Sequence, residues 1–398
     1  MEVRKNGAEH NSDGETLSLL RWASSIIPDY REKGRLDSEF ALLIKRRVSV
    51  KLTSIRVALL SVFLLLGGLV LAQQGEGGYH LIMKYTLGGE GGWDYITLDA
   101  SARRLYLSHR DHVNVLDADS GAVVGDIPGM HLVHSIALVK ELGRGFISDG
   151  SGPTASGSGG DRVVIFDLAT LKVLGEIKTS LNPDCLIYDP ASRLVFSFSG
   201  VGKNVSVIDP ANSVVIATIP MGGKVEYAVA DGKGMIYNNI EDTHEVVGLD
   251  SRALRIKVRW PVAPAGDPTA LAIDREHRRL FSAGRNPKKL VVMDADSGKI
   301  IQSFAIGGNV DAVVYEPETG LVFVSTGEGR LDIFHEDSPE KFEAIQTVYT
   351  QPGARTMAVD PKTHKLFLVT ADFGPPPGLD NPRPLILPGT FVLLVYGR

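Results

Sequence analysis

The sequence predicts an all-β protein, a seven-bladed β-propeller built from four-stranded blades. Two observations in the chain of 398 residues lead to this prediction. An acidic turn residue follows the first strand of each later repeat, at intervals of 42, 43, 42 and 44 residues from Asp189 to Asp360. A second acidic residue ends the third strand of most repeats. A period of about 40 to 45 residues with four strands per repeat is typical of propellers.

The clearest repeat is Ala270–Gly308. The turns within it are rich in Asp, Asn and Gly, which favour or tolerate turn conformations. Its four predicted strands are Ala270–Ile273, Arg279–Ala283, Leu290–Met293 and Lys299–Ile306. Because a unit of this kind cannot bury both of its faces alone, it needs neighbours of its own kind.

Two sets of acidic residues mark the seven repeats. The turn after the first strand is marked by Asp99, a degenerate Val139-Lys140, Asp189, Asp231, Asp274, Glu316 and Asp360. The end of the third strand is marked by Asp117, Asp167, Asp209, Asp250 and Asp294. Two independent markers with one period make chance a poor explanation.

The ends of the repeat region predict how the ring closes. The last repeat has two strands, a long insertion and a third strand over Gly389–Tyr396, and the given sequence stops before a fourth. His80–Leu87 is followed by two glycines, as is the fourth strand of the clearest repeat. We therefore expect this N-terminal strand to complete the last blade, which removes an open sheet edge.

The start of the chain predicts export. Val57–Val70 is an apolar run with a basic flank before it and small Ala72 after it, as in a secretory signal peptide. We assign residues 48–72 to a signal cleaved after Ala72, because the run is shorter than the ~20 residues of a membrane span. An uncleaved anchor is the alternative, and it would be the protein's only membrane association. Both place the rest of the chain in the periplasm or outside the cell.

The remaining boundaries follow from this assignment. Residues 1–47 form a tail that we expect to be absent from the mature protein, with the natural start at Val48 or Val50. A genuine cytoplasmic tail is the alternative. The propeller domain spans residues 79–398, and we expect a monomer.

Composition excludes several classes. The formal net charge is -5 and no basic stripe is present, so we expect no nucleic-acid partner. Cys185 is the only cysteine, which excludes an intramolecular disulfide and C-x-x-C-H haem attachment.

The repeat motifs VNVLDADSG, VSVIDPANS and VVMDADSGK, with the turns DPASRLVF, EPETGLVFV and DPKTHKLFL, resemble the YVTN / YncE-like family of bacterial seven-bladed propellers. The likeness covers about Tyr79 to Arg398 and is weakest in the second and fourth repeats. It implies the propeller fold. It carries little about function, because the shared residues are mainly turn and core positions.

Two insertions break the period. Asp149–Asp161 is rich in Gly and Ser and predicts a flexible loop between the second and third strands of the second blade. Phe373–Gly389 holds six prolines and predicts a stiff extended segment at the same place in the seventh blade. We expect the two insertions to flank one sector of the same face.

The candidate ligand site is a ring at the channel mouth. In a propeller the first strand of each blade lines the channel, so the residue just before that strand points at the mouth. Counting five residues back from each turn marker gives Asp94, His134, Asp184, Glu226, Thr269, Asp311 and Arg355. Such a ring attracts cations and has oxygen ligands for Ca²⁺. The alternative is that these side chains only cap strand ends and bond neighbouring loop amides.

Histidines supply the candidates for a softer metal. His131 and His134, three residues apart, combine with Asp94 and Asp184 as possible ligands. His109 and His112 flank a turn in the first blade and are placed to face one another across it. We expect these two to be exposed turn residues, since ligation needs a third group.

Function is open between two classes. The sequence has no G-x-S-x-G, H-E-x-x-H or Walker motif, which favours a non-enzymatic exported propeller that binds a protein, a peptide or a small polar ligand over its channel face. The alternative, implied by related propeller families, is a lactonase-type hydrolase or a dehydrogenase-type subunit. It would use a metal or an acid/base pair among Asp94, His134, Asp184 and Glu226.

Overall fold

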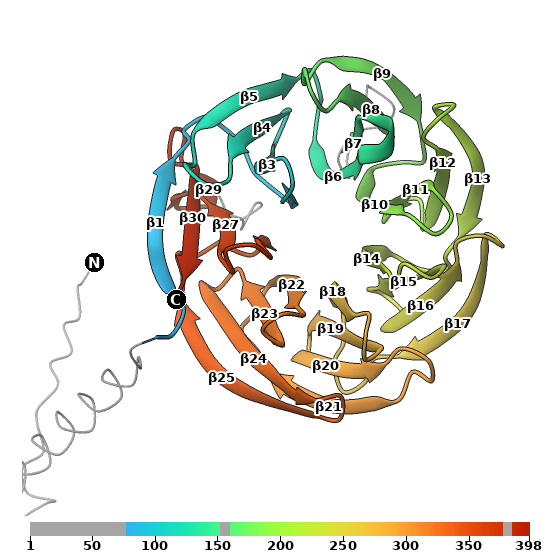
Figure 1. Ribbon diagram of the computed structural model, residues 1–398, viewed down its shortest axis with the longest axis vertical. Helices are drawn as coiled ribbons and strands as arrows, with labels where there is room; N and C mark the ends of the chain where they lie inside the picture. The colour runs from blue at the N-terminus through green and yellow to red at the C-terminus, as the bar shows by residue number, and fades with distance from the viewer. Residues whose placement is uncertain (1–76, 152–159, 377–383) are drawn as a thin grey trace, which may run out of the picture. The chain divides into compact units, whose positions relative to one another are not determined.

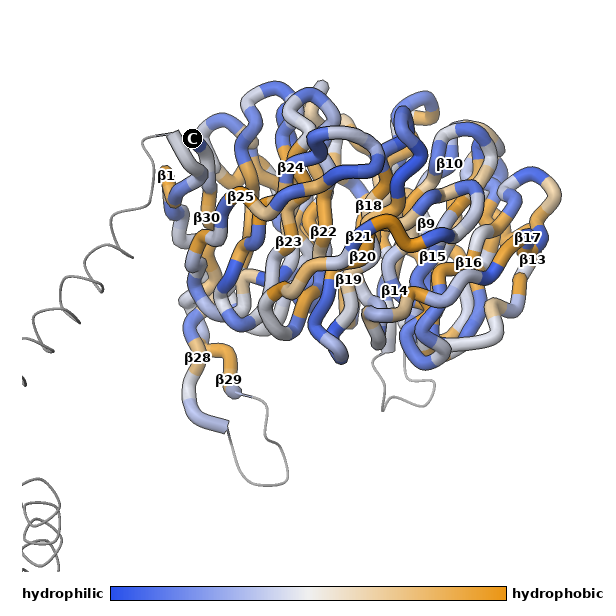
Figure 2. The backbone as a smooth tube through the Cα atoms, turned by 90° about the horizontal axis from the view of Figure 1, so that it is seen from below, coloured by the Kyte–Doolittle hydropathy of each residue, from blue (hydrophilic) through white to orange (hydrophobic). Residues whose placement is uncertain are grey.

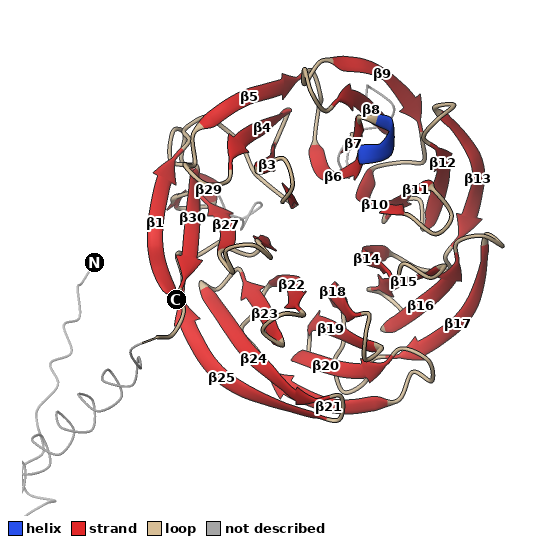
Figure 3. Cartoon of the chain, in the orientation of Figure 1, coloured by secondary structure: helices blue, strands red, loops and turns tan. Residues whose placement is uncertain are grey.

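The computed structural model describes residues 77–151, 160–376 and 384–398. Within these ranges seven four-stranded antiparallel sheets are arranged as blades in a ring around a common axis (Figure 1). This confirms the predicted seven-bladed β-propeller. Figure 3 shows how completely strands dominate, since the one helical element described is the short 3-10 helix η1 (Lys140–Leu142). The predicted tail and signal, residues 1–47 and 48–72, lie outside the described residues.

Each blade runs from an inner strand at the channel to an outer strand at the rim. Blade 1 holds β2 (Ile96–Asp99), β3 (Arg104–His109), β4 (His112–Asp117) and β5 (Val123–Pro128). Blade 2 holds β6 (Val133–Val139), β7 (Arg144–Asp149), β8 (Arg162–Asp167) and β9 (Val173–Lys178). Blade 3 holds β10 (Pro183–Asp189), β11 (Leu194–Ser199), β12 (Asn204–Asp209) and β13 (Val214–Pro220). Blade 4 holds β14 (Val225–Ala230), β15 (Met235–Ile240), β16 (Glu245–Asp250) and β17 (Arg255–Pro261).

The later blades follow the same order until the last. Blade 5 holds β18 (Pro268–Asp274), β19 (Arg279–Arg285), β20 (Lys288–Asp294) and β21 (Ile300–Ala305), close to the predicted strands. Blade 6 holds β22 (Val310–Glu316), β23 (Leu321–Thr326), β24 (Arg330–Ser338) and β25 (Lys341–Tyr349). Blade 7 holds β26 (Met357–Val359), β27 (Leu366–Thr370), β30 (Val392–Gly397) and β1 (His80–Thr86).

Burial explains the sequence pattern of the strands. All seven positions of β18 are buried, whereas β17 alternates between exposed and half-buried positions. The inner strand β18 is therefore a mainly apolar run, and the outer strand β17 alternates. The apolar side chains fill the spaces between consecutive blades, as between blades 5 and 6, where Phe281 and Val324 belong to one cluster. In Figure 2 hydrophobic backbone runs through the body of the ring and hydrophilic loops cover its two faces. No helix in the described ranges is long and apolar enough to cross a bilayer.

The predicted ring closure is confirmed. β1 pairs antiparallel with β30, from His80 opposite Gly397 to Thr86 opposite Val392. Tyr79 anchors the start of this strand, since its ring packs edge-on against Phe323 of blade 6 at 5.0 Å. Blade 7 therefore joins the two ends of the domain. Its outer strand β1 comes from the N-terminal end of the domain, and its three other strands come from the C-terminal end (Figure 1).

The acidic markers act as turn caps, as their position predicts. The Oδ1 atom of Asp99 accepts hydrogen bonds from the backbone N–H groups of Ser101 and Ala102. Asp274 does the same for Glu276 and His277 with its two oxygens. These bonds fix the tight turn between first and second strands.

Both insertions leave the ring on the mouth side, as predicted. β7 ends at Asp149, which lies opposite Val133 at the start of β6, and β27 ends on the same side of blade 7. The two insertions therefore flank blade 1. Residues 152–159 and 377–383 lie outside the described ranges. The prediction of an extended segment is wrong for the ends of the second insertion, because Phe373 and Ile386 pair in a short hairpin, β28 (Phe373–Gly374) with β29 (Leu385–Ile386), which projects from one face in Figure 2.

The closure predicts a large effect of removing β1. A chain that begins at Leu87 leaves β30 as an unpaired edge and loses the backbone hydrogen bonds of β1. At roughly 0.5 to 1.5 kcal/mol net for each bond, we expect the free energy of unfolding to fall by at least about 3 kcal/mol relative to a chain that begins at Gly77. Urea unfolding of the two purified chains measures this difference. Equal stability would show that β1 does not close the ring.

Candidate functional site

Six of the seven predicted mouth residues line one cavity of about 140 Å³ at the start of the inner strands. They are Asp94, Asp184, Glu226, Thr269, Asp311 and Arg355. The seventh, His134, lies directly beside them and contacts Asp94. The structure therefore brings the whole predicted ring together. Tyr95 and Arg285 complete the lining of the cavity.

Hydrogen bonds between neighbouring blades hold the ring backbone. The Ser148 hydroxyl in blade 2 donates to the backbone carbonyl of Asp184 in blade 3, at 2.6 Å. The Ser325 hydroxyl in blade 6 donates in the same way to the carbonyl of Arg355 in blade 7, at 2.5 Å. The predicted mouth residue Thr269 has this bracing role too, because its buried hydroxyl donates to the carbonyl of Val310 at 2.9 Å. These bonds fix the positions from which the mouth side chains project.

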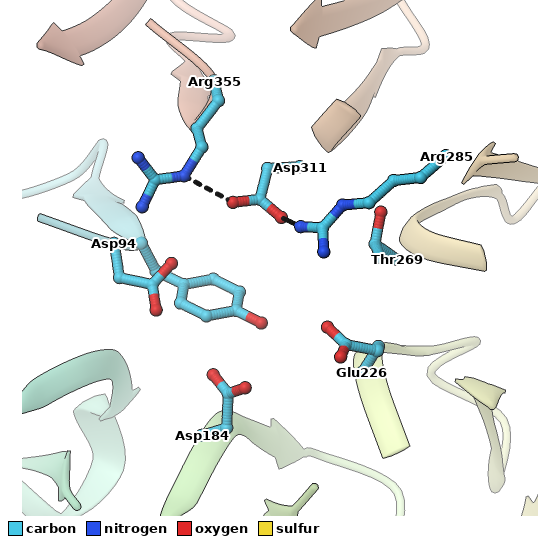
Figure 4. Close-up of a pocket in the computed structure, with 8 residues that line it drawn as sticks. Asp94, Asp184, Glu226, Thr269, Arg285, Asp311 and Arg355 are labelled. Carbon is cyan, nitrogen blue, oxygen red and sulfur yellow. Dashed lines mark hydrogen bonds and ion pairs between the residues drawn. The ribbon is translucent and has the colours of Figure 1, made fainter. Parts of the chain in front are cut away.

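Two arginines share one carboxylate on one side of the mouth. Asp311 accepts from Arg285 through Oδ1 at 2.6 Å and from Arg355 through Oδ2 at 2.7 Å. Figure 4 shows this carboxylate between the two guanidinium groups. Arg355 is held further by the carbonyl of Trp93 at 2.9 Å and by the face of the Trp93 ring at 5.4 Å. Arg285 also lies 3.7 Å from Glu241, which Lys224 contacts as well. Three cations, Arg285, Arg355 and Lys224, therefore share the carboxylates of Asp311 and Glu241, and this side of the mouth keeps an excess of positive charge.

Asp94, His134 and Asp184 form a second group on the mouth. The Nδ1 atom of His134 lies 2.7 Å from Oδ2 of Asp94 and 3.8 Å from Oδ1 of Asp184. Although burial disfavours the imidazolium, the two carboxylates raise the pKa of His134 to about 9. A protonated His134 between two carboxylates leaves this group negative.

The Asp184 side chain is the least satisfied member of that group. Burial, opposed by His134 and reinforced by Asp94, raises the pKa of Asp184 to about 6. Among the described residues no hydrogen-bond donor reaches its buried Oδ1 atom. An unpaired buried carboxylate oxygen is costly, so Asp184 is the lining residue with the clearest need for an added donor.

Glu226 is paired within the protein. Its carboxylate lies 2.8 Å from Nζ of Lys224, which also contacts Glu241. Burial and the nearby Asp184 raise the pKa of Glu226 well above its usual range, which favours a neutral Glu226 that hydrogen-bonds to Glu241. Lys224 then balances the one remaining negative charge.

The structure brings together three of the four predicted metal candidates. Ligand atoms of Asp94, His134 and Asp184 lie within 4.8 Å of one another. His131 is not among them, because its backbone N–H and ring turn to Asp149. The raised pKa of His134 favours the protonated imidazole and its ion pairs with Asp94 and Asp184 at neutral pH. The group fits an ion pair better than a Ca²⁺ site, for which six to eight oxygen ligands are usual.

The predicted His109–His112 pair is confirmed in its geometry and corrected in its exposure. The two residues lie opposite one another across the turn, with ring centroids 4.6 Å apart. His109 is buried rather than exposed, because its ring packs on Phe391 at 4.2 Å and its Nδ1 atom lies 2.9 Å from Oδ1 of Asn114.

Sequence reasoning missed Arg285, Tyr95, Lys224 and Glu241. Arg285 ends the second strand of blade 5, a position that counting back from the turn marker does not reach. Lys224 and Tyr95 are direct chain neighbours of strand starts, and a wider window around each start would have included them.

Comparisons with known proteins identify the fold and no family. No protein-family model matches the chain, and no curated protein sequence matches it. Among solved structures, a chain in the crystal structure of the mitotic checkpoint complex superposes with a TM-score of 0.65 at 14% identity, covering 82% of this chain and 94% of that one. At this identity the likeness shows the propeller fold alone.

The mouth electrostatics predict the titration of His134. Its folded pKa of about 9 exceeds the ordinary value of 6.5, so its ion pair stabilises the fold fully below about pH 6.5 and progressively less as the pH rises through 9. Replacing Asp94 by Asn removes one of the two carboxylates and should lower the His134 pKa to below about 8. Side-chain NMR of His134 over a pH series measures both values. An unchanged pKa in the variant would contradict the assigned pair.

Proposed function

We propose that the protein is an exported binding protein whose channel mouth recognises a positively charged group on a protein, a peptide or a small polar ligand. The observation that carries this proposal is the mouth cavity itself, with Oδ1 of Asp184 buried, lacking a donor among the described residues, and part of a negative group. An ammonium or guanidinium group supplies both the missing donor and the missing charge.

The opposite side of the mouth sets a second requirement on the ligand. Arg285 and Arg355 together exceed the charge of Asp311, and Asp184 lies across the opening from this group (Figure 4). A ligand that carries a hydrogen-bond acceptor or an anion beside its cationic group matches both sides. The cavity of about 140 Å³ holds a group the size of an amino-acid side chain, so a larger partner has to rest on the surrounding face.

The hairpin of blade 7 offers such a resting surface. Phe373 lies 6.0 Å from the Trp93 ring, one residue before Asp94, while Leu385 and Leu387 are exposed nearby. An apolar rim beside a charged pocket is a common arrangement at protein-binding sites. The resemblance to a chain from a checkpoint complex agrees with a role in binding proteins, and the apolar run before residue 72 supports export. Membership of the YVTN / YncE-like family stays a prediction from the repeat motifs, and so does the monomeric state.

The binding proposal predicts selective stabilisation by cations. Free arginine and agmatine should raise the melting temperature of the protein, and at 100 times its Kd a ligand stabilises by about 2.7 kcal/mol. Asp184→Asn should abolish the effect, while the exposed Asp337→Asn should retain it. The effect should also weaken as the pH falls below about 6, because Asp184 then becomes neutral. Equal shifts in wild type and Asp184→Asn, or none in either, would contradict the proposal.

An enzyme remains the second candidate, and one observation favours it. At neutral pH Asp184 is a base and protonated His134 an acid, both of shifted pKa and within 3.8 Å of one another beside a cavity, which is typical of general acid/base pairs. The lactonase or dehydrogenase type of activity would need a metal or a proton-transfer step at this group. A lactone substrate turned over by wild type and not by Asp184→Asn would support the enzyme over the binding protein.

A further inference from the structure

We propose that a divalent transition-metal ion binds between blades 5 and 6, on the face opposite the channel mouth, held by Asp274, His277 and Glu336. The three residues place one ring nitrogen and two carboxylate oxygens within 4.8 Å of one another. The site is separate from the channel mouth, because Asp274 ends the inner strand β18 whose start faces the mouth. Its existence does not depend on the proposed function.

The repeats show what normally neutralises the acidic turn marker. At three of the contacts between neighbouring blades, the acidic turn marker of one blade pairs with a basic residue of the next blade. In each case the basic residue stands four positions after the turn marker of the blade to which it belongs. The pairs are Asp231 with Arg278 at 2.8 Å, Asp360 with Arg103 at 2.7 Å, and Glu316 with His364. A buried carboxylate is thus matched by a cation supplied from its neighbour.

The junction between blades 5 and 6 departs from this rule. By the same rule, the basic partner of Asp274 would stand four residues after Glu316, the turn marker of blade 6. That position is occupied by Gly320. No lysine or arginine ion pair reaches Asp274 in the described part of the chain, and its partner is His277 from its own turn, at 2.8 Å.

A second buried carboxylate makes the imbalance larger. Glu336, on β24 of blade 6, has a side chain only 2% exposed and lies 3.1 Å from Nδ1 of His277. Within the described ranges neither of its oxygens accepts a well-aligned hydrogen bond, although the Tyr315 hydroxyl lies beside it. The two buried carboxylates of Asp274 and Glu336 therefore share the single imidazole of His277. At the three contacts described above, one carboxylate pairs with one basic side chain.

Blade 3 provides an internal comparison. Its marker Asp189 also lacks a basic partner from the next blade, where Met235 holds the equivalent position. Its oxygens instead accept hydrogen bonds from the backbone of Ala191 and Ser192 and from the Ser192 hydroxyl, and no second carboxylate joins it in the clusters found among the described residues. A missing basic residue alone does not make a cation site. The addition of buried Glu336 does.

The ligand set indicates the class of metal. One imidazole and two carboxylates suit Zn²⁺ or Mn²⁺, whereas Ca²⁺ prefers six to eight oxygens. The His277 side chain is 41% exposed, so the metal has a path to solvent and water can complete its coordination.

Zinc titration of the chelator-treated full chain tests the site. We expect one Zn²⁺ to bind per chain by isothermal titration calorimetry, with a rise in melting temperature. Glu336→Gln preserves the size of the side chain and should weaken Zn²⁺ binding at least about tenfold. His364→Ala removes a histidine from the similar junction between blades 6 and 7, which has one carboxylate, and should leave Zn²⁺ affinity unchanged. Asp184→Asn should also leave it unchanged, which separates this site from the channel mouth.

A designed replacement of the metal gives a second test. Arg103 and Arg278 adopt φ angles of 55° and 60° at the position equivalent to Gly320, whose φ is 66°. A Cβ atom at Gly320 would meet its nearest neighbour, the Glu336 carbonyl oxygen, at 3.4 Å. Gly320→Arg therefore supplies the basic residue found at other junctions, and should raise the melting temperature of the metal-free protein and weaken Zn²⁺ binding about tenfold or more. Absence of stoichiometric Zn²⁺ binding to wild type, or equal binding to Glu336→Gln, would overturn the proposal.

Discussion

The antiparallel pairing of β1 with β30 is the constraint on which the rest of the structure depends. It joins the two ends of the domain within one blade and leaves no gap in the ring. Contacts across the closure rely on it. Arg103 of blade 1 binds Asp360 of blade 7, and Arg355 of blade 7 donates to the carbonyl of Trp93. The mouth is one site because the ring is closed.

Charge on this ring is placed where the inner strands begin and end. The inner strand β18 is buried at all seven positions, and hydrophilic residues gather at the two faces of the ring. At the mouth, His134 and Lys224 reduce the negative charge and Asp311 reduces the positive charge, which leaves two sides of opposite sign. On the opposite face, most buried turn acids pair with a basic residue, as Asp231 does with Arg278. The same repeat thus produces a charged cavity at one end and a set of ion pairs at the other.

The sequence predicts the fold and the position of the mouth because both depend on the period. The nearly equal spacing of Asp189, Asp231 and Asp274 fixes the strand starts, and the residues five positions earlier do meet around the cavity. The period does not give the reach of long side chains, which is why Arg285 from the second strand of blade 5 was missed. The period also does not predict the partner of a histidine. His131 and His134 are only three residues apart, yet His131 contacts Asp149 and His134 contacts Asp94.

Departures from the repeat carry more functional information than the repeat itself. Gly320 is unremarkable in the sequence, and only alignment with Arg103, Arg278 and His364 in the folded ring shows that a basic residue belongs there. The insertions of blades 2 and 7 are visible from sequence, yet the hairpin that places Phe373 against Trp93 required the structure.

A crystal structure of the protein grown with free arginine tests the central claim most directly. The guanidinium group of the ligand should lie in the channel mouth, within hydrogen-bond distance of the Asp184 carboxylate, with the ligand carboxylate toward Arg285 and Arg355. Arginine bound elsewhere, with the mouth holding only water, would contradict it.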